Sequence, residues 1–308
     1  MNLFNDTLPY ILSGISVGGQ YALIAIGYTM VYGILRLINF AHGDVFMVAG
    51  LLMVYLAASL PLAIAAPLVI AITVALGFLI ERAAYKPLRT APRMSAMISA
   101  IGVSYLLQNL ALYFTGGLNK NYPVIPWISD TITVFGATTK RVTVITPVLM
   151  ILLVVLLVSL INHTKIGMAM RAVAKDFETS QLMGIKINSV ISVTFIIGSF
   201  LASIASMLFF SNYPGVIPTA GAMPGLKAFV AAVFGGIGSV PGAVLGGVLI
   251  GICESIIKGL DTILVHSGVL KTPLELSTFS DAFTFILLIV ILVFKPTGLF
   301  GEKATDKV

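Results

Sequence analysis

The chain has 308 residues, of which 58% are hydrophobic and 10% charged, and its mean hydropathy is +1.05. Soluble domains carry roughly 25% charged residues, so this composition excludes a water-soluble globule and indicates a membrane protein. The formal net charge is +6, but the basic residues are spread over short segments between apolar runs, which excludes the basic face of a nucleic-acid-binding protein.

The apolar runs, taken in chain order, predict a series of transmembrane helices, because about 20 apolar residues cross the hydrocarbon core. Thr7 to Leu35 gives the first span, and no basic segment or cleavage site marks it as a removable signal peptide. The run from Val45 to Ile80 is too long for one helix and should break near Pro61 into two short spans. Further spans are predicted at Met94–Thr115, Val144–Ile161, Asn188–Phe210 and Leu276–Phe294.

Basic loops set the predicted orientation of these spans. The segment from Arg82 to Arg93 carries four basic residues and no acidic one, so the positive-inside rule places it in the cytoplasm. Alternation then puts the N-terminus outside, 116–142 outside, 162–187 inside and the C-terminus in the cytoplasm. The basic residues of 162–187 and of the C-terminal tail agree with this alternation.

The apolar segment from Ala228 to Cys253 must cross an even number of times if the orientation holds. Its centre is rich in glycine, so we expect a hairpin over about 226–257 in which two short or half helices meet at a glycine break. Such a break could form part of a solute pathway through Gly235, Gly236 and Gly238; a tight hairpin packed through small residues is equally compatible. The predicted fold class is thus an all-α polytopic membrane helical bundle of about eight transmembrane elements, in one domain over 1–308.

Glycines four residues apart predict close helix packing. Gly14 and Gly18 lie in the first span, and Gly247 and Gly251 lie in the glycine-rich segment. This spacing lets two helices approach closely.

The cytoplasmic segment from Gly167 to Ile185 predicts a short amphipathic helix beneath the membrane. Met170, Val173 and Phe177 fall on one apolar face. That face could dock onto a partner protein or lie on the lipid surface, although the acidic residues of the segment disfavour a purely electrostatic attachment to lipid.

Polar side chains in or near the spans are candidates for the path of a small solute. His42 and Asp44 are more simply explained as an interfacial helix end, and amides in spans often hydrogen-bond neighbouring helices. Intramembrane charge is nearly absent, which argues against an ion relay, and Glu81 and Glu254 are expected as solvated carboxylates near span ends. The candidates are Gln20, Tyr21, Asn39, His42, Gln108 and Asn109.

Nothing in the sequence indicates catalysis, a metal site or a bound cofactor. The three histidines lie in different loops, no HExxH or GxSxG motif is present, and Cys253, the only cysteine, excludes a disulfide within the chain. A GxxxxGK[ST] loop is also missing, so ATP would have to be used by other subunits.

Several sequence blocks resemble a known family of transporters. Glu178, Thr179, Ser180 and Gly184 are similar to the Glu-Ala-Ala-x-x-x-Gly loop of ABC-importer permeases, with Thr and Ser in place of the alanines. YALIAIGYTMVYGILRLINFAHGD (Tyr21 to Asp44) resembles the first conserved block of LivH-type permeases of branched-chain amino acid ABC transporters. ERAAYKPLR, ISAIGVSYLLQN, KAFVAAVFGGIGSVPGAVLGG and KPTGLFG follow in the order of the same family.

The resemblance implies a permease subunit of a bacterial inner-membrane importer for leucine, isoleucine and valine, forming half of the translocation pathway. Its expected partners are a second homologous permease subunit, two cytoplasmic ATPase subunits and an extracytoplasmic substrate-binding protein. A related importer for urea or short amides, or an ion-coupled carrier, remains an alternative. The residues expected to couple to the ATPases are Arg171, Val173, Phe177, Glu178 and Gly184.

Overall fold

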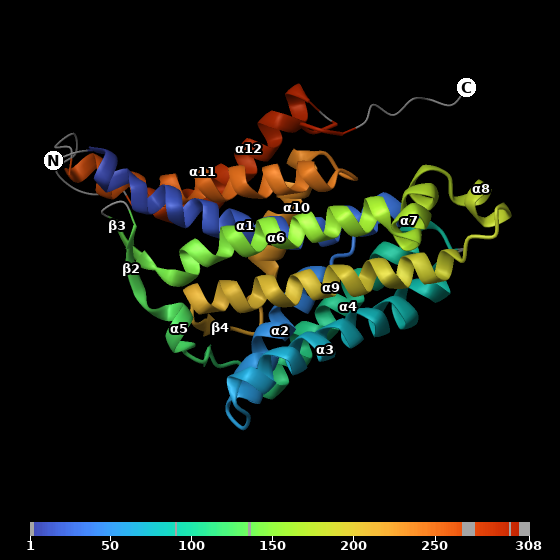
Figure 1. The fold of residues 1–308 in the computed structure, drawn as a ribbon, viewed down its shortest axis with the longest axis horizontal. Coiled ribbons are helices and arrows are strands. Elements are labelled where there is room, and N and C mark those ends of the chain that lie inside the picture. Colours follow the sequence, from blue (N-terminus) through green and yellow to red (C-terminus); the bar gives the residue numbers. More distant parts are fainter. Residues whose placement is uncertain (1–2, 90, 135–136, 267–274, 296, 302–308) are drawn as a thin grey trace.

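The computed structural model describes residues 3–89, 91–134, 137–266, 275–295 and 297–301. These residues form a bundle of long helices that run side by side (Figure 1). Seven of the helices are long and apolar enough to cross a membrane. The predicted class, an all-α polytopic membrane bundle, is therefore confirmed.

Nine helices make up the bundle within the described residues. Short elements lie between them: η1 is Glu81–Tyr85, η2 Lys86–Leu88, α5 Pro126–Ser129, α7 Lys165–Lys175, α8 Phe177–Leu182 and η3 Leu276–Phe279. The bundle helices are α1 Leu3–Leu35, α2 His42–Ala57, α3 Leu62–Ile80, α4 Arg93–Thr115, α6 Arg141–His163, α9 Ile187–Asn212, α10 Ala222–Gly235, α11 Val240–His266 and α12 Ser280–Phe294.

Two small sheets lie in the connections. β1 (Lys120–Asn121) pairs antiparallel with β4 (Gly215–Val216), with Lys120 opposite Val216. β2 (Thr131–Val134) and β3 (Ala137–Lys140) form an antiparallel pair with Thr131 opposite Lys140. Figure 1 places β2, β3 and α5 at the end of the bundle that carries the N-terminus, and α7 and α8 at the opposite end.

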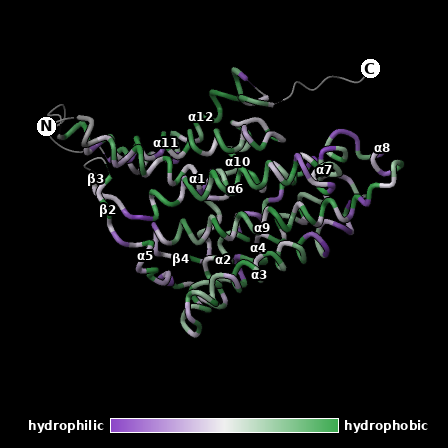
Figure 2. The backbone as a smooth tube through the Cα atoms, in the orientation of Figure 1, coloured by the Kyte–Doolittle hydropathy of each residue, from purple (hydrophilic) through white to green (hydrophobic). Residues whose placement is uncertain are grey.

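Hydropathy follows this geometry. The long helices are coloured mainly as apolar, whereas polar residues gather in the connections at the two ends (Figure 2). Two polar ends separated by an apolar middle are what a bilayer requires of a spanning protein.

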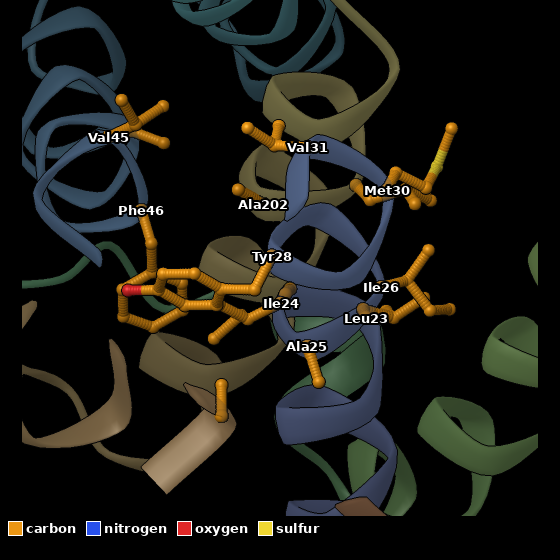
Figure 3. Close-up of a cluster of buried hydrophobic side chains, with 14 of the residues drawn as sticks. Leu23, Ile24, Ala25, Ile26, Tyr28, Met30, Val31, Val45, Phe46 and Ala202 are labelled. Atoms are coloured by element: carbon orange, nitrogen blue, oxygen red, sulfur yellow. The ribbon is translucent and has the colours of Figure 1, made fainter. Parts of the chain in front are cut away.

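Helix α1 lies at the centre and packs closely on α11 through glycine. A Cβ atom added at Gly18 would lie 2.7 Å from the Cα of Val248, and one added at Gly251 would lie 2.2 Å from the backbone nitrogen of Gly18. Both distances are below any real Cβ contact, so the two backbones touch as the glycine spacing predicted. Helices α1, α2 and α9 contribute to the buried apolar cluster of Figure 3, which includes Tyr28 of α1, Phe46 of α2 and Ala202 of α9.

Two of the bundle helices, α2 and α10, are too short to cross a membrane alone. Their first turns meet inside the bundle, because a Cβ added at Gly43 would lie 2.7 Å from the Gly221 carbonyl oxygen and 3.0 Å from the Cα of Gly225. Each short helix therefore begins inside the protein, where neighbouring helices surround its first turn.

The prediction of a hairpin of two short helices is correct for α10 and wrong for α11. Helix α10 is short, with 14 residues, but α11 continues for 27 residues and is long enough to span. Proline is tolerated in the first turn of a helix, so Pro241 does not interrupt α11. The break between the two helices lies at the predicted glycines, and Gly236 and Gly238 adopt φ values of +102° and +100°, which only glycine adopts readily.

Candidate translocation and coupling sites

The segment predicted as one amphipathic helix is divided into α7 and α8. The division lies at Asp176, whose carboxylate accepts hydrogen bonds from the Thr179 backbone N–H at 3.1 Å and from the Thr179 hydroxyl at 2.7 Å. Asp176 is thus the N-cap of a second helix. An aspartate followed by an acidic first-turn residue, Glu178, was the sequence signal for this new helix start.

Two of the three residues of the predicted apolar face, Met170 and Val173, pack inside the chain, and the third, Phe177, is exposed at the start of α8. Met170 and Val173 are only 5% and 2% exposed, and α7 contacts α6, α1 and α9. Exposed apolar side chains lie at both ends of the segment: Ile166 and Met168 in the first turn of α7, and Phe177, Leu182 and Met183 on or directly after α8. Leu182 is 87% exposed and Met183 78%.

Gly184 ends α8. Its φ of +81° lies in the left-handed region, its N–H donates to the Gln181 carbonyl, and the N–H of Ile185 donates to the Ser180 carbonyl at 3.1 Å. Hydrogen bonds of this kind, from backbone N–H groups just after a helix to carbonyls of its last turn, are common where a glycine follows the helix end. The glycine of the motif therefore turns the chain from α8 back toward α9.

Two charged residues of the predicted coupling set have different surroundings. The Arg171 guanidinium donates to the Ile161 carbonyl at 2.6 Å and to the Asn162 side-chain oxygen at 3.0 Å. It therefore caps the last turn of α6, where backbone carbonyls lack helical partners. Glu178 is exposed at the start of α8.

Gln20 and Tyr21, the first two path candidates, are both buried inside the bundle. Gln20 is fully buried, and neither atom of its amide has a hydrogen-bond partner in the described part of the chain. The Tyr21 hydroxyl donates to Glu254 at 3.0 Å. Neither side chain reaches the outer surface of the subunit.

Tyr21 belongs to a buried ion-pair network that the sequence did not reveal. The Glu254 carboxylate lies 2.8 Å from the Lys227 ammonium and 2.5 Å from that of Lys258, and Lys227 also pairs with Asp281 at 2.5 Å. The side chains of Glu254 and Lys227 are 3% and 6% exposed. The expectation of a solvated Glu254, and of almost no intramembrane charge, is wrong because Lys227 on α10 and Lys258 on α11 pair with the Glu254 carboxylate.

The second expected solvated carboxylate, Glu81, is also buried. It pairs with Arg89 and accepts a hydrogen bond from the Ser192 hydroxyl at 2.8 Å. Asn39 lies in the same region, where its side-chain oxygen accepts from the Tyr85 hydroxyl at 2.8 Å. These contacts join the end of α3 and η1 to α9 and to the α1–α2 connection.

His42 is buried as well, so its interpretation as an interfacial helix end is wrong. The ring is perpendicular to that of Tyr28, with centroids 5.0 Å apart. It fits beside Gly27, where an added Cβ would lie 2.2 Å from Nε2, and near Gly198, where an added Cβ would lie 3.4 Å from Cε1. Glycines on α1 and α9 thus make room for the first residue of α2.

Asp44 attaches α4 to α2. Its carboxylate accepts hydrogen bonds from the Ser104 hydroxyl at 2.5 Å and from the Gln108 amide at 3.0 Å. Gln108 therefore serves helix packing, as amides in spans often do. The adjacent Asn109 is exposed on the other side of α4 and donates to the Tyr105 carbonyl at 2.7 Å.

The candidate glycines lie at the end of α10. Gly235 and Gly236 are closely packed, because added Cβ atoms would lie 2.0 Å from the Gly242 carbonyl oxygen and 2.3 Å from the backbone nitrogen of Gly301. Within the part of the chain that the structure describes, no atom lies within 4 Å of a Cβ added at Gly238. Of all the path candidates with side chains, Asn109 alone is exposed on the described surface of the subunit.

Comparisons with known proteins agree with this architecture. Residues 10–292 match the family described as branched-chain amino acid transport system permease components. The chain is 39% identical to the high-affinity branched-chain amino acid transport system permease protein BraD of Pseudomonas aeruginosa, covering 98% of each chain. It is 38% identical to the permease protein LivH of Escherichia coli K12, covering 98% of this chain and 97% of LivH.

The match to the family extends over nearly all the bundle helices, from α1 into α12. Identity is likewise spread over almost the full length of two permease relatives. Together with its seven candidate spans, these similarities show that the chain is a multi-pass membrane protein of the LivH and BraD type and belongs to the family of branched-chain amino acid transport permeases.

Proposed function

We propose that the chain is the permease subunit of an ATP-driven importer that moves leucine, isoleucine and valine across a bacterial inner membrane. It would form half of the pathway beside a second homologous permease, with two cytoplasmic ATPases and an extracytoplasmic substrate-binding protein as the other partners. The chain itself would hold no cofactor, and the ATPases would use the ATP. The observation that carries this proposal is the full-length similarity to permeases named for branched-chain amino acids.

The proposed contact with the ATPases is the α8 segment, Phe177 to Gly184. Helix α7 is fixed to the bundle by Met170 and Val173 and by the cap that Arg171 gives to α6. The α8 segment instead presents exposed apolar side chains at the end of the bundle (Figure 1). An exposed apolar group on a rigid support is what a partner protein can bind.

Movement of the α8 segment would pass directly into the bundle. Gly184 turns the chain into α9, and α9 packs against α1, α2 and α3. Closure of the ATPases would push on α8 and shift the helices packed against α9. Such a shift of packed helices between two arrangements would switch the pathway between outward and inward access.

The coupling proposal is tested in vesicles that contain the assembled transporter. Glu178→Arg and Leu182→Glu are expected to reduce ATP-driven uptake roughly tenfold, the loss that about 1.4 kcal/mol of contact energy produces, while the permease remains inserted. Lys175→Glu, a charge reversal at an exposed position of α7, is the matched control and should transport normally. Unchanged uptake in both α8 variants would contradict the proposal.

The substrate class is tested by uptake of labelled leucine, isoleucine and valine beside labelled urea. ATP-dependent entry of the three amino acids is expected. Entry of urea without leucine would instead assign the chain to an amide importer.

The proposed orientation has the N-terminus outside and the C-terminus in the cytoplasm, on the basis of the basic segment from Arg82 to Arg93. A cysteine placed at Met183 should then react with an impermeant thiol reagent only from the cytoplasmic side, and one placed at Leu118 only from the outside. Both positions are well exposed, so reversed labelling would contradict the orientation.

A further inference from the structure

Helix α4 exposes polar side chains at membrane depth. Tyr105 is 63% exposed, Tyr113 is 81% exposed and Asn109 is exposed between them. Gly102 is exposed too, and a Cβ added there would meet no atom of the described residues within 4 Å. These four residues, spaced three or four apart, share one face of the helix, which we call the α4 face.

The hydrogen bonds to Asp44 determine where this face points. Ser104 and Gln108 lie on a different side of α4 and bind the Asp44 carboxylate of α2. Because successive residues are about 100° apart around a helix, fixing Ser104 and Gln108 toward α2 turns Tyr105 and Asn109 away from the bundle. The exposure of the α4 face is thus a result of the fold.

Other exposed helix faces have a different composition. The large exposed side chains of α3 include Ile72, those of α6 include Val155, and those of α12 include Ile289. Within these three spans they are aliphatic or phenylalanine, except for Asn162 and His163 in the last turn of α6. Such surfaces suit acyl chains. The α4 face is therefore unlike the surfaces that this chain presents to lipid.

An amide at this depth needs water or protein around it. Asn109 lies six residues before Thr115, the last residue of α4, which is about 9 Å along the helix, and Tyr105 lies about 15 Å from that end. Tyr113 could belong to an interfacial aromatic belt, but Asn109 and Tyr105 are too deep for this. Polar groups held at such depth usually face a water-filled cavity or another helix.

We propose that the α4 face lines the aqueous translocation pathway, which the second permease subunit closes on its other side. The Asn109 amide can both donate and accept a hydrogen bond and the Tyr105 hydroxyl can do the same, so together they can bind the carboxylate and ammonium of a zwitterionic amino acid. Exposed Leu106 and Leu110 beside them suit an aliphatic side chain. This inference rests on the proposed function and adds the surface that contacts the solute.

The test is thiol labelling in vesicles that contain the assembled transporter. Cys253→Ser removes the single native cysteine, and single cysteines are then placed at Tyr105, Asn109, Val155 and Ile289. Val155 and Ile289 are matched controls, since both are exposed mid-helix residues of other spans, at 59% and 61%.

A water-soluble methanethiosulfonate reagent should label cysteines at 105 and 109 about tenfold faster than those at 155 and 289, because only the thiolate, which water stabilises, reacts. Leucine, supplied with the binding protein, should slow labelling at 109. Equal rates at all four positions would indicate lipid on the α4 face and would overturn the proposal. Cysteines at 105 and 109 that resist the reagent but cross-link to the second permease would overturn it too, by indicating a dry interface.

Labelling and uptake separate this inference from the proposed function. Leucine uptake with an unlabelled α4 face would overturn the α4 pathway alone. Fast labelling at 105 and 109 in a transporter that moves another solute would support the pathway and remove only the assignment of branched-chain amino acids.

Discussion

The centre of the bundle and helix α4 are held together by different means. At the centre, the backbones of α1 and α11 touch through Gly18 and Gly251, and Lys227 and Glu254 form a buried ion pair across neighbouring helices. Helix α4 is attached by hydrogen bonds of Ser104 and Gln108 to Asp44, and a much smaller share of its residues is buried than in α1. The centre therefore has little room for added volume, whereas α4 has more.

The sharpest test of this difference adds volume to each region. Gly251→Leu should prevent accumulation of folded permease, since the new Cβ would overlap the α1 backbone, and overpacking against backbone cannot be relieved by a change of rotamer. Gly102→Leu in α4 is the control and should accumulate normally, because that position is open. Size-exclusion profiles of the detergent-solubilised proteins measure both, and equal profiles would show that the two regions pack alike.

Removing one member of the buried ion pair should have the next largest effect. Glu254→Ala leaves the buried Lys227 with the half-exposed Asp281 as its acidic partner, and removing one member of a buried pair costs about 3–5 kcal/mol. Lys258→Met removes a partner that is 44% exposed and should cost less than about 1 kcal/mol. Thermal unfolding in detergent compares the two variants, and an equal loss in both would show that burial does not strengthen the Glu254 contacts.

The hydrogen bonds that attach α4 to Asp44 should stabilise the protein less than the buried ion pair does. Ser104→Ala removes one of the two hydrogen bonds that the Asp44 carboxylate accepts, and one bond to a charged group contributes about 1.5–3 kcal/mol. A double-mutant cycle with Asp44→Ala measures the coupling between these residues by thermal unfolding. Strictly additive effects would contradict a direct bond between Asp44 and Ser104.

Removing the Arg171 side chain that caps α6 should have the smallest effect on stability. Arg171→Ala should destabilise the last turn of α6 by about 1 kcal/mol, the usual net contribution of a hydrogen bond. Amide hydrogen exchange at Asn162 and the next residues should then be faster, while Arg171→Lys should keep part of the protection. Unchanged exchange in Arg171→Ala would indicate that the guanidinium does not cap the helix.

Most spanning helices could be predicted from the sequence, because a run of about 20 apolar residues has few other uses. The apolar run from Val144 to Ile161 became α6, and the glycine spacing predicted the close packing of α1 on α11. The buried charges could not be predicted in this way. Tyr21 and Glu254 lie 233 positions apart, and a single sequence does not reveal which distant residues become partners.

The environments of the site residues were harder still to predict. Gln108 and Asn109 are adjacent amides with the same composition around them, yet Gln108 binds Asp44 and Asn109 is exposed. The rotation of α4 decides between these outcomes, and that rotation depends on a carboxylate from another helix. The split at Asp176 was predictable in principle, since an N-cap residue and an acidic first turn mark a helix start.

The contact of Gly43 with Gly221 and Gly225 has a consequence for biosynthesis. Helix α2 leaves the ribosome early, but the surface that receives its first turn belongs to residues made much later, and chains grow at about 5–20 residues per second. Until then α2 is a short helix whose buried polar start, His42 and Asp44, faces the bilayer or the insertion machinery. The N-terminal half of the permease therefore stays incompletely assembled until the C-terminal half has been synthesised.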